Sequence, residues 1–180
     1  MKILAFAASN SRKSINKSLV SYSSTLVEAH VEILDINDYT MPIYGEDLEK
    51  EQGIPEAASQ FLDKISQADA LLISFAEHNG NYTVAFKNLF DWASRKRMDV
   101  YQSKPVVMLS ASPGASGASS VLGLARESAH FFKGNVLATV SIPSFYDNFD
   151  VDKNEISNPA LAAELKVALA KLTKKQLTSA

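Results

Sequence analysis

The sequence predicts a doubly wound α/β fold, in which helices cover both faces of a five-stranded parallel sheet. Five short apolar runs alternate along the chain with segments of helical periodicity. This alternation is typical of parallel sheets with right-handed crossovers. No repeat, low-complexity tract or linker interrupts the 180 residues. We therefore expect one domain over residues 1–180, with a single core.

Each predicted strand is an apolar run short enough to be buried on both faces. The runs are residues 3–8, 31–36, 70–75, 105–110 and 135–142. Helices are predicted over residues 56–66, 84–94 and 159–172. Another follows residue 14, where Leu19, Tyr22 and Leu26 recur at helical spacing, and a further one ends at about residue 132. The polar connection over residues 37–55 has no such pattern, and connections of that length are usually functional or mobile.

Composition argues against several classes of protein. Eighteen basic and twenty acidic residues leave a formal charge of -2, without the basic excess that nucleic-acid and membrane-surface binding require. The chain has no cysteine, and its three histidines show no metal-ligand spacing, so no metal site is expected. No apolar run approaches the roughly 20 residues of a membrane span. The amino terminus turns polar too soon for a secretory signal, so we expect a cytoplasmic protein.

Three loops of unusual composition follow predicted strands. They are residues 9–16, 76–82 and 111–117, called here the first, second and third loops. Doubly wound sheets bind ligands at the carboxyl ends of their strands, where the strand order reverses. All three loops are expected at that edge, and together they predict the binding site.

The first loop combines hydroxyl, amide and cationic side chains just before a helix. A phosphate needs hydrogen-bond donors, and the N–H groups of a helix amino terminus provide them with a favourable dipole. The side-chain donors are Ser9, Ser11, Ser14 and Asn16. No GxxxxGK or GxGxxG motif is present, which argues against a nucleoside triphosphatase and a dinucleotide fingerprint. The alternative is that Ser14 only caps the helix.

The second and third loops suit the approach of a flat ring. Asn79 and Gly80 tolerate positive φ, so this polar turn offers backbone groups to the edge of a ring. The third loop is small and glycine-rich, which leaves its backbone unobstructed. The alternatives are an ordinary Asn-Gly turn with a solvent-facing His78 and a plain strand-to-helix turn.

Aromatic side chains gather just past the last predicted strand, at Phe145, Tyr146 and Phe149. Exposed aromatics in a loop indicate a lid or a subunit contact, and the alternative is that they pack into the core. We favour the contact.

The first loop and the long connection resemble motifs of the NAD(P)H-dependent FMN reductases, a flavodoxin-like group that includes quinone, azo-dye and chromate reductases. Residues 8–16 resemble G-S-x-R-x-x-S-x-N, with Ser11 in place of the usual arginine and Arg12 one place later. Residues 42–47 resemble the P-x-Y-x-E-D stretch of these enzymes. The resemblance covers the chain to about residue 143.

The other two loops resemble further motifs of this family. Residues 76–80 resemble P-E-Y-N followed by glycine, with Ala76 and His78 as departures. They lead into a K-N-x-x-D-W helix at residues 87–92, which matches fully. Residues 110–118 resemble S-x-S-P-G-x-x-G-G, with alanine in place of the last glycine.

The resemblance implies a flavodoxin-like sheet of strand order 2-1-3-4-5 that binds FMN. It places the phosphate at the first loop and the ring at the second and third loops. The cofactor-binding residues that carry over are Ser9, Ser11, Arg12, Ser14, Asn16, Glu77, His78, Asn79, Gly80, Ser112, Pro113, Gly114 and Gly117. Such enzymes form homodimers or homotetramers, which implies Trp92 and residues 41–50 near a subunit boundary. The alternative for Trp92 is a core anchor within its own chain.

The activity implied is hydride transfer from NADPH or NADH to the flavin and then to free flavin, a quinone, an azo compound or another small acceptor. The flavin supplies this chemistry, so we assign no catalytic residue. The alternatives are a flavodoxin-type electron carrier, which the near-neutral charge disfavours, a relative that binds no flavin, and a regulatory flavoprotein.

Overall fold

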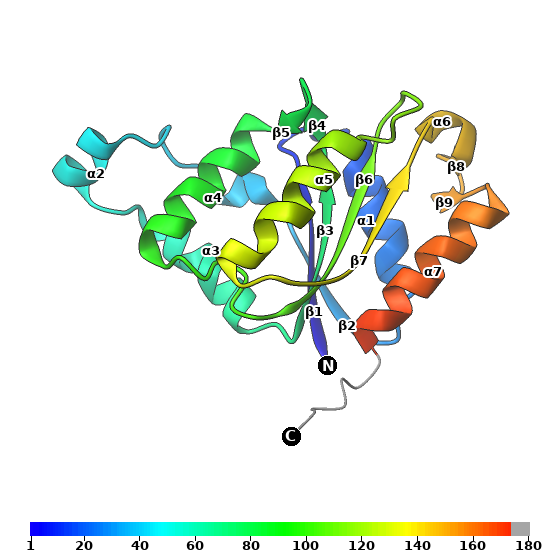
Figure 1. Ribbon diagram of the computed structural model, residues 1–180, viewed down its shortest axis with the longest axis horizontal. Helices are drawn as coiled ribbons and strands as arrows, with labels where there is room; N and C mark the ends of the chain where they lie inside the picture. The colour runs from blue at the N-terminus through cyan, green and yellow to red at the C-terminus, as the bar shows by residue number, and fades with distance from the viewer. Residues whose placement is uncertain (174–180) are drawn as a thin grey trace.

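The computed structural model describes residues 1–173 and contains the predicted five-stranded parallel sheet (Figure 1). The strands lie in the order β2-β1-β3-β6-β7. Their bounds are β1 Lys2–Ala8, β2 His30–Leu34, β3 Ala70–Phe75, β6 Pro105–Ala111 and β7 Asn135–Ile142. Because β4 and β5 form a separate hairpin, this is the strand order 2-1-3-4-5. The doubly wound, flavodoxin-like fold is therefore confirmed.

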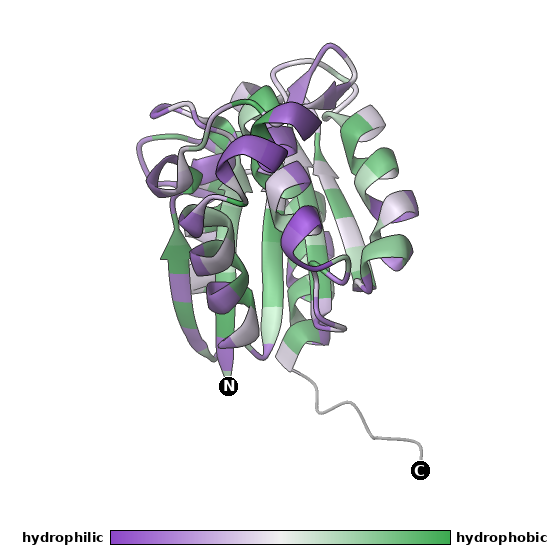
Figure 2. Cartoon of the chain, turned by 90° about the vertical axis from the view of Figure 1, so that its left-hand side faces the viewer, coloured by the Kyte–Doolittle hydropathy of each residue, from purple (hydrophilic) through white to green (hydrophobic). Residues whose placement is uncertain are grey.

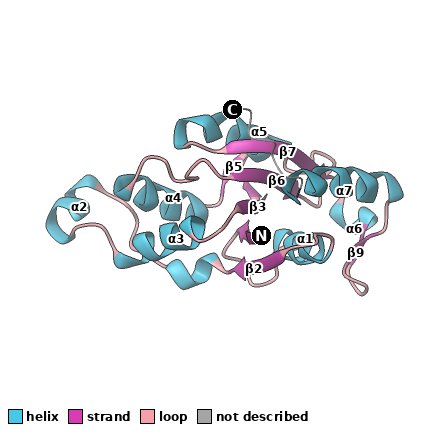
Figure 3. Ribbon diagram, turned by 90° about the horizontal axis from the view of Figure 1, so that it is seen from below, coloured by secondary structure: helices cyan, strands magenta, loops and turns pink. Residues whose placement is uncertain are grey.

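Helices cover both faces of the sheet, as predicted (Figure 3). The helices of one face are α1 Ile15–Thr25 and α7 Pro159–Thr173, and those of the other are α3 Glu56–Ser66, α4 Val84–Lys96 and α5 Ser119–Ser128. Each face has its own apolar core, built around Phe6, Phe61 and Phe86 on one side and around Leu19 and Leu165 on the other. Every residue of β3 is buried, because this central strand is covered from both faces.

The connection over residues 37–55 is not the irregular loop that the sequence predicted. A 3-10 helix, η1 Ile36–Tyr39, begins it, and the helix α2 Glu46–Gln52 follows. No residue of α2 is buried, so no apolar stripe revealed this helix in the sequence. Figure 1 shows α2 projecting from the body of the molecule on the side of α4. The preceding strand ends at Leu34, two residues earlier than predicted.

Several short elements were also missed by the sequence pattern. They are the hairpin of β4 Glu77–His78 and β5 Asn81–Tyr82, the helical turn α6 Phe145–Asn148, and the hairpin of β8 Phe149–Asp150 and β9 Glu155–Ile156. Elements this short carry no readable periodicity. The helix predicted to end near residue 132 is present as α5, which the 3-10 helix η2 Ala129–Phe132 extends to that residue.

Strand β7 forms one edge of the sheet, and its pairing with β6 is irregular. Val106 pairs with Val136, whereas Val107 pairs with Ala138, which leaves Leu137 as a bulged residue. The Leu137 carbonyl accepts a hydrogen bond from the Nζ of Lys171 on α7 at 3.2 Å. The regular row of backbone groups along this edge is therefore interrupted.

Polar residues concentrate in the loops above the carboxyl ends of the strands, whereas the strands themselves are mainly hydrophobic (Figure 2). Within residues 1–173, none of the helices combines the length and the apolar character needed to cross a bilayer. The loops at the carboxyl ends of the strands are therefore the part of the fold that presents polar groups to a ligand.

Candidate functional site

The first, second and third loops lie together at the carboxyl edge of the sheet (Figure 1). They follow β1, β3 and β6, which are direct neighbours in the sheet. The strand order reverses between β1 and β3, and doubly wound folds bind ligands at this reversal. The structure thus brings the three predicted loops to one place.

Asn16 joins the first loop to β3 and β6. Its Oδ1 accepts hydrogen bonds from the Ser74 hydroxyl at 2.7 Å and from the Ala111 N–H at 3.0 Å. Its Nδ2 donates to the Ala111 carbonyl at 3.2 Å, and the residue is only 2% exposed. One side-chain N–H is left for a ligand. The structure therefore gives Asn16 a bracing role that the sequence did not reveal, and its contact with a phosphate stays a prediction.

The second loop is braced at both of its ends. The Glu77 carboxylate accepts a hydrogen bond from the Val121 N–H, in the first turn of α5, at 2.9 Å. Thr83 follows the loop and caps α4, and its hydroxyl donates to the Ala8 carbonyl at the end of β1 at 3.0 Å. Sequence reasoning missed Thr83, although a threonine directly before a helix is a recognised capping signal. These bonds fix the three loops relative to one another.

The start of α1 offers unused donors in the first loop. Ser14 is the residue before this helix, and its hydroxyl makes no capping hydrogen bond. The alternative that Ser14 only caps the helix is therefore wrong. The first helical amides, of Ile15 and Asn16, have no hydrogen-bond partner within residues 1–173. Arg12 and Lys13 are exposed and join no ion pair in that part of the chain.

The other two serines of the first loop, Ser9 and Ser11, differ in exposure. Ser9 is buried, and its hydroxyl accepts a hydrogen bond from the Ser11 N–H at 3.3 Å. Ser11 itself is exposed. The buried hydroxyl of Ser9 shapes the loop, and the exposed hydroxyl of Ser11 faces solvent.

The second loop is a tight hairpin. Glu77 and His78 pair antiparallel with Asn81 and Tyr82, across a turn in which Asn79 and Gly80 have φ of 54° and 75°. Two central residues with positive φ make a type I′ turn, for which Asn-Gly is the favoured pair. A Cβ built on Gly80 would meet nothing within 4 Å, so the backbone of the turn is open to a ligand. His78 faces solvent, and the part of this hairpin in ring binding stays a prediction.

The base of the third loop uses its polar groups internally. The Gly117 carbonyl accepts hydrogen bonds from the Ser110 hydroxyl at 2.7 Å and from the Ser141 hydroxyl at 2.9 Å. Gly117 has φ of 60°, and a Cβ there would overlap the Ser141 hydroxyl. Gly117 is therefore required for packing against β7, a reason different from the ring contact predicted for it.

The tip of the third loop is exposed but rigid. The Ser112 hydroxyl donates to the Gly114 carbonyl at 3.1 Å, and the Ser112 carbonyl accepts from the Phe145 N–H at 3.0 Å. Pro113 and Gly114 are exposed above these bonds. The loop thus offers a fixed stretch of backbone beside the second loop.

The aromatic residues after β7 divide between core and surface. Phe145 and Phe149 are buried and stack on each other, with ring centroids 4.5 Å apart. Only Tyr146 is exposed, at 64%. For Phe145 and Phe149 the expectation of a lid or subunit contact is therefore wrong, because both rings fill the core beside α7.

Trp92 is a core anchor of its own chain, with no exposed surface. Its indole N–H donates to the Pro42 carbonyl at 2.8 Å. Because the side chain is completely enclosed, the structure favours the alternative for Trp92, a core anchor, over a position at a subunit boundary. Residues 41–44, which the indole holds, lie at the surface beside the second loop.

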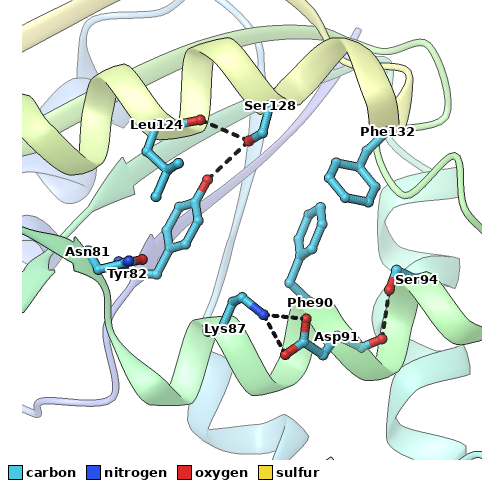
Figure 4. A pocket seen from close by; sticks show the side chains of 9 residues that line it. All are labelled: Asn81, Tyr82, Lys87, Phe90, Asp91, Ser94, Leu124, Ser128 and Phe132. Carbon is cyan, nitrogen blue, oxygen red and sulfur yellow. Dashed lines mark hydrogen bonds and ion pairs between the residues drawn. The ribbon is translucent and has the colours of Figure 1, made fainter.

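A hollow of about 330 Å³ lies between α4 and α5, below the second loop (Figure 4). Its apolar walls are Tyr82, Phe90, Leu124 and Phe132. The hydroxyls of Tyr82 and Ser128 share a hydrogen bond of 3.3 Å, and burial raises the pKa of Tyr82. Lys87 and Asp91 form an ion pair at the rim. Its residues come from three separate segments, so no local sequence signal predicted this hollow.

Comparisons with known proteins identify the family of the chain. The model of the family described as NADPH-dependent FMN reductase matches residues 1–147. An NAD(P)H-dependent FMN reductase of Pseudomonas aeruginosa is 34% identical over 119 residues, which cover 65% of this chain and 63% of that protein. A quinone reductase of Pseudomonas putida is 32% identical over 123 residues, 67% of this chain and 64% of the relative. The matches therefore span slightly less than two thirds of the length of either relative.

A solved structure supports the fold over nearly the whole chain. The flavoenzyme NAD(P)H:(acceptor) oxidoreductase FerB of Paracoccus denitrificans superposes with a TM-score of 0.78. The superposition covers 95% of this chain and 94% of that one, at 21% identity. Such a similarity establishes a common fold.

Proposed function

The chain belongs to the NADPH-dependent FMN reductase family, and from this premise we propose that it binds FMN and reduces the flavin, or a second small acceptor, with NADPH or NADH. When bound, FMN supplies the redox chemistry, which is acceptance of a hydride from the nicotinamide and its transfer to the acceptor. The part of the protein is to bind the cofactor, to orient its ring and to leave one face open to both substrates.

The observation that carries this proposal is the uncapped start of α1 at the reversal of strand order. The Ser14 hydroxyl and the N–H groups of Ile15 and Asn16, which have no partner within residues 1–173, form a set of donors that fits a phosphate. The exposed cations Arg12 and Lys13 add positive charge beside that set. The residues present therefore fit the phosphate end of FMN.

The ring is proposed to lie against the tips of the second and third loops. Gly80 and Gly114 leave open space above the backbone, where a Cβ would meet no atom closer than 3.9 Å. The bond between Glu77 and Val121 keeps the hairpin in place under that space. His78, beside the turn, and Asn79, within it, contact the ring in this arrangement.

The quaternary state is proposed to be a homodimer or homotetramer. Support comes from large apolar side chains on and just after α5 that are exposed to solvent. Leu124 is 38% exposed and Phe131 68%, and a subunit contact would remove their apolar surface from water. A molar mass measured by light scattering tests this, and the mass of one chain alone would contradict it.

The function is tested first with a visible absorption spectrum of the protein mixed with FMN. Bound flavin should bleach when NADPH or NADH is added without oxygen, and the donor that bleaches it faster is the preferred one. Bound flavin that stays oxidised with both donors would favour the electron carrier. A protein that binds no flavin would contradict the proposal. The single domain over residues 1–180 and the cytoplasmic location stay predictions.

A further inference from the structure

The segment of residues 41–44, called here the strap, is held on α4 by the side chain of Asn88. Its Oδ1 accepts a hydrogen bond from the Tyr44 N–H at 2.8 Å. Its Nδ2 donates to the carbonyls of Met41 at 3.2 Å and Pro42 at 3.0 Å. One half-buried amide therefore satisfies three backbone groups of a segment that has no sheet or helix partners of its own.

Trp92, one turn further along α4, completes this clamp. Its indole N–H donates to the Pro42 carbonyl at 2.8 Å, and the Tyr44 ring stands edge-on to the indole at 5.0 Å. Further out, the Tyr44 hydroxyl donates to Glu49, which also pairs with Arg95 at 2.8 Å. The Arg95 guanidinium holds the pKa of the Glu49 carboxyl below its usual value, so this outer pair is charged at neutral pH.

The strap separates two hollows that adjoin the loops of the site. On one side, a hollow of about 300 Å³ is lined by Ile43 and Val84 together with Asn81 of the second loop. On the other side, a smaller, more polar hollow of about 120 Å³ is lined by Met41 and by Asn10 of the first loop. The position of the strap therefore sets the width of both.

The larger hollow combines apolar and polar surface, because Lys87, Asn88 and Asp91 of α4 line it together with Ile43 and Val84. Ile43 is 77% exposed and Val84 69% exposed, so both present apolar surface that a ligand would cover. A volume near 300 Å³ is at the small end of the range for ligand pockets. The adjoining second loop is where the flavin ring is proposed to lie, so a molecule in this pocket would lie beside the ring.

We propose that Asn88 and Trp92 are positioning residues, which hold the strap as the fixed wall of a pocket for the electron acceptor. The proposal rests on the proposed function for the identity of the occupant, but not for the clamp itself. The clamp reduces the conformational freedom of the strap before the acceptor arrives, so less entropy is lost on binding. Within residues 1–173, none of the hydrogen bonds made by Asn88 and Trp92 goes to the first loop.

The clamp is tested by hydrogen exchange of the Tyr44 amide, which donates directly to Asn88. In Asn88→Ala the protection of this amide should fall by about 10- to 100-fold, because up to three hydrogen bonds are lost. Asn88→Asp keeps the acceptor for Tyr44 and loses both donors, so it should restore part of the protection. The matched control is Lys50→Ala, which removes an exposed ion pair within α2 and should leave the Tyr44 amide unchanged.

The pocket is tested with steady-state kinetics on the same variants, with 1,4-benzoquinone as the acceptor. In Asn88→Ala the KM for the quinone should rise about 5- to 10-fold with kcat within twofold, because a displaced wall weakens binding of the acceptor. The dissociation constant of FMN, measured by fluorescence, should not change. A lower thermal stability alone would not raise the KM for the quinone while leaving kcat and the dissociation constant of FMN unchanged.

The possible outcomes separate the two parts of the proposal. Unchanged protection of the Tyr44 amide in Asn88→Ala overturns the clamp. Reduced protection with an unchanged KM overturns the pocket wall. A wild-type protein that leaves FMN oxidised with both donors overturns the proposed function and, with it, the acceptor pocket, whereas the exchange result would still decide the clamp.

Discussion

The first and third loops both contain serines, yet the polar groups of the two loops are used in opposite ways. In the third loop, the hydroxyl of Ser112 and the carbonyls of Gly114 and Gly117 bond within the loop or to its neighbours. In the first loop, the Ser14 hydroxyl and the amide of Ile15 have no such partners within residues 1–173. One loop holds its shape by internal bonds, and the other keeps donors for a ligand.

The difference follows from what surrounds each loop. The third loop lies against the end of β7 and the turn after it, where Ser141 and Ser144 reach its carbonyls. The first loop is held by Asn37 of η1, whose amide donates to the Asn10 carbonyl, and by Asn16 at its end, which leaves donors between them without partners in the described residues. Serine content alone is therefore a poor guide to ligand binding, and the neighbours of the hydroxyls are a better one.

The largest effect is expected where the third loop is most tightly packed. In Gly117→Ala, the new Cβ would overlap the Ser141 hydroxyl and lie 3.0 Å from the Pro143 nitrogen, in a residue with φ of 60°. We expect a loss of about 3–4 kcal/mol in the free energy of unfolding. The control is Gly114→Ala, whose Cβ would meet nothing closer than 3.9 Å. Equal losses in the two variants, measured by urea denaturation, would show that packing is not the cause.

Asn16 is an exception to this difference between the loops. It belongs to the first loop, yet its polar groups are used within the protein, where they brace the sheet. Asn16→Ala leaves the Ser74 hydroxyl and both backbone groups of Ala111 without their partner. The expected loss is about 2–4 kcal/mol of unfolding free energy. Asn10→Ala, at an exposed position of the same loop, is the control and should cost far less. A stable Asn16→Ala protein would refute the bracing role.

A substitution at Ser14 tests whether the first loop keeps its donors for a ligand. Because its hydroxyl makes no capping hydrogen bond within residues 1–173, Ser14→Ala should change the unfolding free energy by less than about 0.5 kcal/mol. The dissociation constant of FMN should rise about tenfold, since one hydrogen bond to a charged phosphate is lost. Ser21→Ala, exposed on the same helix, should change neither quantity. Unchanged FMN affinity in Ser14→Ala would place the phosphate elsewhere.

The smallest expected effect is a dependence of the unfolding free energy on pH, and it arises from β2, outside both loops. Lys2 and Lys64 lower the pKa of Glu32 on β2 from 4.5 to about 2. A carboxylate with a lowered folded-state pKa contributes stability above pH 4.5 and loses it as the pH falls toward 2. The contribution should be at most about 1 kcal/mol, because the group is partly exposed.

Glu32→Gln should remove this part of the acid dependence, as measured by urea denaturation between pH 2 and pH 7. Glu51→Gln on α2, a charge change of the same kind at an exposed position, should keep it. If both variants keep the wild-type dependence, the Lys2–Glu32–Lys64 group does not cause it. The loop variants are then best compared at neutral pH, where Glu32 is fully ionised.

The elements that bury an apolar stripe were predictable from sequence, and the others were not. The bounds of α3, β3 and β7 agree with the predicted ranges, because each has its apolar residues at a regular spacing. The helix α2 buries nothing, so only its tertiary setting shows it. The hairpin at Asn79 and Gly80 had a turn signal, but its paired strands are two residues each.

The location of the candidate site was predictable from the sequence, but the hydrogen bonds within it were not. Three polar loops after buried strands indicated one edge of the sheet, which needs only the topology of the fold. Which donors stay free depends on distant partners, such as Ala111, which lies 95 positions from Asn16. The two alternatives for Trp92 likewise depended on whether Pro42 folds back onto α4. Long-range contacts of this kind leave no local pattern.

The bulge in β7 bears on how the protein behaves when it is concentrated. A regular, uncovered edge strand is a template onto which a foreign strand can add, and repeated addition builds fibrils. At Leu137 the bulge breaks the spacing of the backbone groups, and Lys171 already occupies the carbonyl there. An incoming strand would have to displace an ammonium group and still find its register broken. The sequence itself therefore disfavours growth of the sheet past this edge at Leu137.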